Sequence, residues 1–175
     1  MPPELTFDLS KIDFDHIVCG KDEIRKVLPQ RFEFEQLDAV VHVSTADNIV
    51  VGYKDVRHDE FWVRGHLPGY PLFPGVLMCE AAAQLCSFYV VKYHIPDAFI
   101  GFGGMENVRF RGTVHPGDRF VIVGKALKIS RRHMLFETQG FVGDKMVFSG
   151  EVMGLQLTRP ESLDAKPAQQ SGARA

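Results

Sequence analysis

The sequence lacks the features that hold many small proteins together through covalent or metal links. Its 175 residues include three cysteines, at positions 19, 79 and 86, and no Cys-x-x-Cys pair. An odd number of cysteines without paired spacing matches neither a disulfide framework nor a zinc site. We therefore interpret them as free thiols that act as small apolar side chains in a reducing compartment, the cytoplasm, and we expect no metal site.

The chain also carries little net charge. Its 20 Lys and Arg residues against 22 Asp and Glu residues give a formal charge of −2, and the basic residues are scattered along the sequence. Proteins that bind nucleic acid usually gather positive charge on one face, so we expect no nucleic-acid partner. The N-terminus shows no basic segment followed by an apolar run, and we predict no secretory signal.

Only one hydrophobic run, residues 75–91, comes close to the length of a membrane span. A span needs about 20 predominantly apolar residues, and this run is shorter and contains Glu80 and Gln84. We predict a buried core helix instead. Pro74 suits its first turn, where a missing N–H costs no hydrogen bond, and Pro96 favours an end near Tyr93.

Shorter elements are predicted on both sides of this helix. Before it we expect a short helix over 22–28 and extended segments over 32–34, 39–44 and 48–55. After it we expect a backbone turn at 101–104 and then strands over 108–114, 120–130, 134–142 and 147–157, which form an antiparallel meander because Gly143-Asp144 is a two-residue hairpin link.

These elements predict an α+β protein with one folded domain. A helix that is apolar on nearly every side must be enclosed, and a curved antiparallel sheet wrapped around it would enclose it. We place the domain at residues 21–158. Residues 1–20 are expected to form an extension that packs on the domain, and residues 159–175, which are rich in Pro, Ala, Gln and Ser, to form a disordered tail.

The residues best suited to chemistry lie at the start of the predicted helix. His66 lies in a Gly- and Pro-rich loop, and Glu80 lies six residues into the helix. An unpaired carboxylate is costly to bury in its charged form, so a helix that keeps one indicates a use for it. An imidazole and a carboxylic acid that meet at an apolar cleft can transfer protons. The plainer interpretation is a structural hydrogen bond from Gln84, one turn further on, and both can hold if Gln84 orients Glu80.

Three segments of the chain resemble one enzyme family. Residues 65–85, GHLPGYPLFPGVLMCEAAAQL, resemble the active-site segment of the beta-hydroxyacyl-(acyl carrier protein) dehydratases of type II fatty-acid synthesis. Residues 24–31, IRKVLPQR, resemble the "I…LPHR" segment of these enzymes, and residues 107–118, NVRFRGTVHPGD, their "ARFRRPVxPGD" segment. The family has the hotdog fold, in which a sheet wraps one long central helix.

The resemblance implies a role for each residue of the candidate site. His66 matches the catalytic histidine, Glu80 the catalytic acid, and Gly75 the glycine whose N–H binds the thioester carbonyl oxygen. It also implies a homodimer, or a trimer of dimers, in which each site takes His66 from one subunit and Glu80 from the other. The implied partner is acyl carrier protein, whose phosphopantetheine arm carries the acyl group, and no further cofactor is implied.

The chain also departs from the family pattern, and the departures leave more than one function open. Gln30 stands where the family usually has histidine, and Leu67 where it usually has phenylalanine. Glu80 favours the plain dehydratase over the dehydratase–isomerase, which usually has aspartate. A hotdog acyl thioesterase and a non-catalytic acyl-binding subunit are two further possibilities. Reversible dehydration of (3R)-3-hydroxyacyl to trans-2-enoyl thioester is the leading hypothesis.

Overall fold

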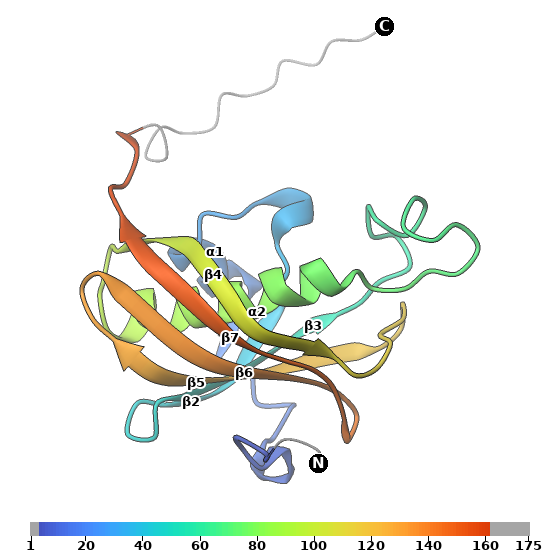
Figure 1. Cartoon of the computed structure of the whole chain (residues 1–175), viewed down its shortest axis with the longest axis horizontal. Coiled ribbons are helices and arrows are strands. Elements are labelled where there is room, and N and C mark those ends of the chain that lie inside the picture. Colours follow the sequence, from blue (N-terminus) through green and yellow to red (C-terminus); the bar gives the residue numbers. More distant parts are fainter. Residues whose placement is uncertain (1–3, 162–175) are drawn as a thin grey trace, which may run out of the picture.

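The apolar run predicted to be a core helix forms α2 (Gly75–Tyr93), which lies in the concave face of a curved sheet (Figure 1). The computed structural model describes residues 4–161. Pro74 precedes the helix as its N-cap, one position before the predicted first turn, and its carbonyl accepts the first helical hydrogen bonds. Because α2 is apolar on most sides, it contacts β3, β4, β5, β6 and β7 and leaves little surface to solvent.

Within the described residues the sheet has seven strands, and every neighbouring pair is antiparallel. The strands are β1 (Cys19–Gly20), β2 (Ala39–Ser44), β3 (Ile49–Asp55), β4 (Phe99–Phe110), β5 (Arg119–Ile129), β6 (His133–Val142) and β7 (Lys145–Leu157). Their spatial order is β1-β2-β3-β5-β6-β7-β4. The predicted α+β class with a sheet wrapped around one helix is therefore confirmed, and the 12-residue strand β4 forms one edge of the sheet.

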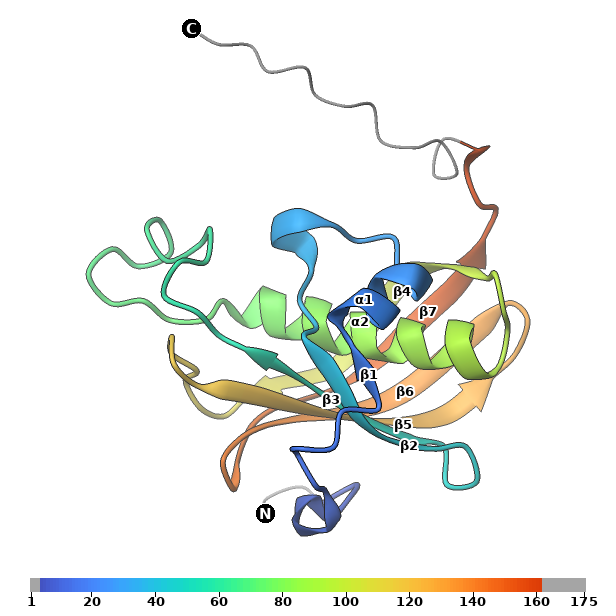
Figure 2. The ribbon, with the colours of Figure 1, turned by 180° about the vertical axis from the view of Figure 1, so that it is seen from behind.

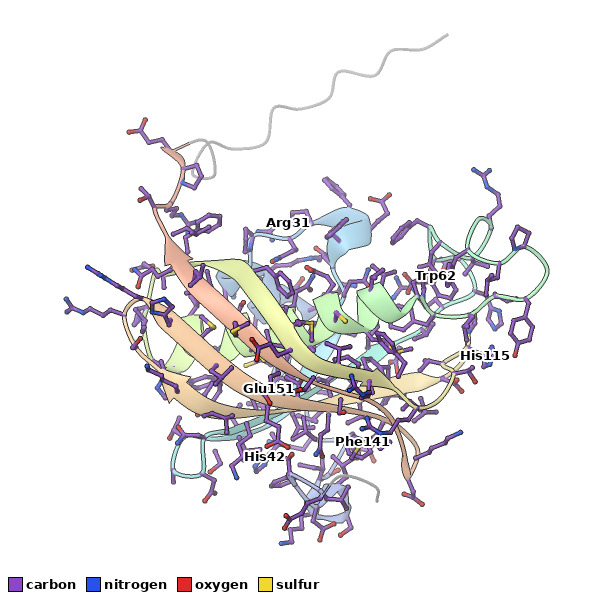
Figure 3. All side chains as sticks on the ribbon, viewed as in Figure 1. Arg31, His42, Trp62, His115, Phe141 and Glu151 are labelled. Atoms are coloured by element: carbon purple, nitrogen blue, oxygen red, sulfur yellow. The ribbon has the colours of Figure 1, made fainter. Side chains whose placement is uncertain are left out.

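The prediction for residues 32–34 was wrong, because this segment is the short 3-10 helix η2 (Phe32–Phe34) rather than a strand. Phe32 has a positive φ of 58°, which a strand does not allow. Arg31, labelled in Figure 3, directly precedes η2. Its guanidinium donates hydrogen bonds to the carbonyl oxygens of Arg25, Leu28 and Gln30 and so fixes the chain that leads into η2. Before it lies α1 (Lys21–Val27), close to the predicted helix over 22–28.

The prediction for β4 was wrong at both ends. The strand begins at Phe99 and ends at Phe110, so it includes the glycine-rich residues 101–104 that were expected to form a turn. These glycines serve close packing between strands. A Cβ at Gly101 would overlap the side chain of Leu157 on β7, and one at Gly103 would lie 3.0 Å from Cγ of Leu155. Long-range packing therefore outweighs the local turn preference of glycine here.

The N-terminal residues cover the outer, convex face of the sheet (Figure 2). This face carries a second apolar cluster that includes Val51, Val123 and Phe141, and residues of the extension, among them Phe7 and Phe14, pack against it. The extension contains the short 3-10 helix η1 (Leu9–Lys11). From residue 162 onward, the predicted tail lies outside the described residues.

Candidate active site

His66 lies in the long loop between β3 and α2, and its ring is fixed by the backbone of that loop. Its Nδ1 lies 2.8 Å from the carbonyl oxygen of Leu72. The backbone N–H of His66 donates a hydrogen bond to the carbonyl of Trp62. A carbonyl oxygen only accepts hydrogen bonds, so Nδ1 carries the proton and Nε2 of the neutral ring keeps its lone pair. The loop thus holds the tautomer that a general base requires.

Two buried contacts anchor this loop, and neither was predicted from the sequence. The rings of Trp62 and Phe73 pack with centroids 5.7 Å apart, and both side chains are buried. Nζ of Lys54, on β3, lies 2.7 Å from Oε1 of Glu60, and the two side chains are 0% and 4% exposed. Nη2 of the half-exposed Arg57 lies 3.5 Å from the same oxygen of Glu60. Removing Glu60 would leave the buried charge of Lys54 uncompensated, so the pair ties the start of the loop to the sheet.

A second histidine lies under the tip of the loop. His115 Nδ1 is 3.1 Å from the carbonyl oxygen of Pro71, and its ring meets that of Tyr70 edge to face at 5.5 Å. Figure 3 shows His115 and Trp62 at the end of the molecule from which the loop extends. His115 therefore supports the loop that holds His66, a role not predicted from the sequence.

Glu80 lies on the second turn of α2, half-buried, and the predicted hydrogen bond with Gln84 is present. Nε2 of Gln84 donates to Oε1 of Glu80 at 2.7 Å. The same amide nitrogen donates to the carbonyl of Phe34, and Oε1 of Gln84 accepts from the N–H of Gln36. Gln84 is 2% exposed, so its amide orientation is fixed, and it presents a donor to the carboxyl group of Glu80.

Gly75 is the first residue of α2, where backbone N–H groups have no partner within the helix. The N–H groups of Leu77 and Met78 are already used by the carbonyl of Pro74. A Cβ at Gly75 would lie 2.8 Å from Cζ of Phe110, so a larger residue here would require the half-exposed Phe110 ring to move. The positive end of the helix dipole favours a negative oxygen at this point.

Glu80 opens into a small cavity between α2 and the sheet. The cavity has a volume of about 50 Å³ and is lined by Gln30, Glu80, Ala83, Gln84, Cys86, Ser87, Ile100, Gly101, Phe102, Met134, Val152, Met153 and Gly154. His66 does not line it, so within one chain the loop histidine and the helix carboxyl group do not share a cavity. Of the two departures from the family pattern, Gln30 lines this cavity, whereas Leu67 is exposed at the loop tip with φ 60°.

Within residues 4–161, no group of three or more His, Cys, Asp or Glu side chains is placed to hold a metal ion. One helix of the same region, α2, is long and apolar enough to span a membrane, with a mean hydropathy of 1.2. The core helix of a soluble protein meets the same criterion, and 61% of the apolar window of α2 is buried inside the fold.

Comparisons with known proteins give one consistent result. Residues 28–151 match the model of the FabA-like domain. The chain is 38% identical over 135 residues to 3-hydroxyacyl-(acyl-carrier-protein) dehydratase FabZ of Saccharophagus degradans, covering 75% of this chain and 92% of that protein. It is 32% identical over 133 residues to FabZ of Clostridioides difficile, covering 75% and 93%.

Solved structures show the same fold at low sequence identity. The dehydratase heterocomplex ApeI:P of Xenorhabdus doucetiae contains a chain that superposes with a TM-score of 0.66 at 20% identity, covering 81% of this chain and 95% of that one. Cj0977, described as a virulence protein of Campylobacter jejuni, superposes with a TM-score of 0.59 at 14% identity, covering 87% and 97%.

Proposed function

The chain belongs to the FabA-like family of dehydratases, and from this premise we propose that it removes water from 3-hydroxyacyl thioesters with His66 and Glu80. It is a hydro-lyase, a 3-hydroxyacyl-(acyl-carrier-protein) dehydratase of fatty-acid synthesis. The substrate is the (3R)-3-hydroxyacyl group on the phosphopantetheine arm of acyl carrier protein, and the product is the trans-2-enoyl thioester. We assign the enzyme to the cytoplasm, with no cofactor beyond that arm.

The observation that carries this assignment is the hydrogen bond between Nδ1 of His66 and the carbonyl of Leu72. It leaves Nε2 free to accept a proton from C2 of the substrate. The electron pair of that C–H bond forms the C2=C3 double bond as the C3–O bond breaks. Glu80 donates its proton to the departing hydroxyl group, which leaves as water. General acid and base groups of this kind contribute about 10²–10⁴-fold each.

As C2 loses its proton, negative charge develops on the carbonyl oxygen of the thioester. Gly75 is suited to stabilise it, because its N–H points from the positive end of α2 and has no helical partner. The ring of Phe110 packs against the side of Gly75 where a side chain would otherwise stand. Gln84 acts as a positioning residue that directs the proton of Glu80.

The separation of His66 from the cavity of Glu80 supports a homodimer with shared sites. Among the described strands, edge strand β4 pairs only with β7, and an edge without a neighbouring strand is a ready surface for pairing with a second copy. Three large apolar side chains at and near this edge are exposed, Val76 at 74%, Phe102 at 61% and Phe110 at 52%. We propose that two chains associate through this edge and that His66 of one completes the site of the other.

The direct test is the hydration of crotonyl thioester and the reverse reaction, followed with His66→Ala and Glu80→Gln. Each substitution is expected to lower kcat by about 10²–10⁴-fold with an unchanged circular dichroism spectrum. Met146→Ala, a substitution on the outer face of the sheet, serves as the control and should keep the rate. Rates close to wild type in both site variants would refute the mechanism.

Product analysis in the same assay separates the competing functions. Release of free thiol would identify a thioesterase, and a cis-3-enoyl product would identify a dehydratase–isomerase. Tight acyl binding without turnover would identify a non-catalytic subunit.

A further inference from the structure

A buried amide oxygen without a partner belongs to a residue that shares the cavity of the candidate catalytic acid. Gln30 lies in the loop after α1, and its side chain lines the same cavity as Glu80 and Gln84. Arg31 fixes this loop, since its Nη1 donates to the carbonyl oxygen of Gln30 at 2.6 Å. Within residues 4–161, Oε1 of Gln30 is buried and has no hydrogen-bond partner. A buried acceptor that lacks a donor is costly, and in native proteins such a group often has a catalytic or binding role.

The charged groups on the other side of Gln30 are already paired. A second, smaller cavity beside Gln30 is lined by Lys21, Arg25 and Glu35. Both cations bind the carboxylate of Glu35, Nε of Arg25 at 2.8 Å and Nζ of Lys21 at 3.6 Å, and Lys21 also pairs with Asp38. These groups are engaged with one another, so the cavity of Glu80 is left as the source of a donor for Gln30.

In the cavity of Glu80, the lining side chains that carry nitrogen or oxygen are those of Gln30, Glu80, Gln84 and Ser87. Both polar atoms of the Gln84 amide group already have partners. Ser87 lies two turns beyond Glu80, a rise of about 10 Å along the helix. Glu80 and Gln30 are therefore the acid and the acceptor that a small polar group in this cavity can meet together. They lie on α2 and on the loop after α1, so pairing of two chains at β4 leaves them in place.

We propose that Oε1 of Gln30 accepts a hydrogen bond from the 3-hydroxyl group of the substrate and holds this group as it leaves as water. The proposal rests on the proposed function, since it takes Glu80 as the proton donor to the same oxygen. With the hydroxyl hydrogen directed to Gln30, a lone pair of the hydroxyl oxygen faces Glu80. Glu80 gives its proton to that oxygen as the C3–O bond breaks, and the water formed lies between the two side chains. In the reverse reaction the same hydrogen bond orients the attacking water.

The test compares the wild type with Gln30→Met, which keeps the length of the side chain and removes its amide group. Loss of one hydrogen bond to the reacting hydroxyl group should lower kcat for the dehydration of 3-hydroxybutyryl pantetheine by about tenfold. Butyryl pantetheine lacks the hydroxyl group, so its inhibition constant should stay at the wild-type value. Because the variant removes an unpaired buried acceptor, its thermal midpoint should equal or exceed that of the wild type.

Two further variants complete the test. Gln156→Met, the same change at an exposed position of β7, should keep the wild-type kcat, and Gln30→Leu replaces Gln30→Met if the latter does not fold. A wild-type kcat in the folded variant, or weaker inhibition by butyryl pantetheine, would overturn the proposal while the dehydratase function stands. Failure of both apolar variants to fold would show that Gln30 supports the fold and would overturn it as well. Inactivity of the wild type would instead refute the proposed function.

Discussion

A mixture of two inactive variants offers the sharpest test of a site shared between subunits. His66→Ala and Glu80→Gln each remove one member of the proposed proton-transfer pair. In a homodimer of either variant, both sites lack the same group, so both homodimers should be inactive. A heterodimer differs. If His66 works with Glu80 of the other chain, one of its two sites combines both substitutions and the other contains neither.

The expected recovery follows from this symmetry. Random association makes half of the dimers heterodimers, and each has one intact site of two, so about a quarter of the wild-type activity should return. If His66 and Glu80 of the same chain worked together, each site of the heterodimer would carry one substitution and no activity would return. The structure favours the first outcome, because Glu80 lines a cavity from which His66 is absent.

The assay is the hydration of crotonyl thioester after the two purified variants are unfolded together, refolded and compared with each variant refolded alone. Wild-type protein taken through the same cycle gives the reference rate, and size-exclusion chromatography confirms that dimers have formed. A mixture no more active than its components, in samples that contain dimers, would refute the shared site. The single-variant rates measured beforehand still report whether the two residues are needed.

Two further predictions concern the support of the site. Lys54→Met should lower the free energy of unfolding by at most about 3–5 kcal/mol, because it leaves the buried Glu60 with only the more distant Arg57, at 3.5 Å. The double variant Lys54→Met/Glu60→Leu should recover much of this loss in chemical denaturation, and a double variant as unstable as the single one would contradict the assignment. The second concerns Glu35, whose pKa is lowered from its ordinary 4.5 by the hydrogen bonds from the Arg25 guanidinium and by the charges of Arg25 and Lys21. The stability that these contacts of the Glu35 carboxylate contribute is present above pH 4.5 and is lost as the pH falls through the lower pKa of the folded state. The stability difference between wild type and Glu35→Gln should therefore shrink between pH 6 and pH 3. A difference that stays constant over this range would contradict the prediction.

The parts of the fold that the sequence predicts are those in which local pattern and long-range packing agree. The bounds of α2 follow from an apolar run between Pro74 and Pro96, and the hairpin at residues 143–144 follows from its Gly-Asp link. The hydrogen bond between Glu80 and Gln84 follows from helical spacing alone. Each depends on residues close in sequence.

The parts that the sequence does not predict depend on distant partners. The glycines within residues 101–104 predict a turn from local sequence alone. The structure instead shows them in β4, packed against Leu155 and Leu157 of β7. Lys54 follows five uncharged residues of β3, and only the fold shows that Glu60 approaches it within 2.7 Å. In both cases the contact joins residues that are distant in sequence. Glycine usually favours turns and charged side chains usually lie at the surface, so the residue types alone do not predict it.

The segment predicted least well is also the one that orients the proposed acid. Gln84 can direct Glu80 only because the carbonyl of Phe34 and the N–H of Gln36 fix both ends of its amide group. Glu35 lies between these two residues, and Arg25 and Lys21 hold its carboxylate from α1. The backbone of residues 34–36 therefore links the ion pairs of α1 with Glu35 to the hydrogen bonds that hold Gln84.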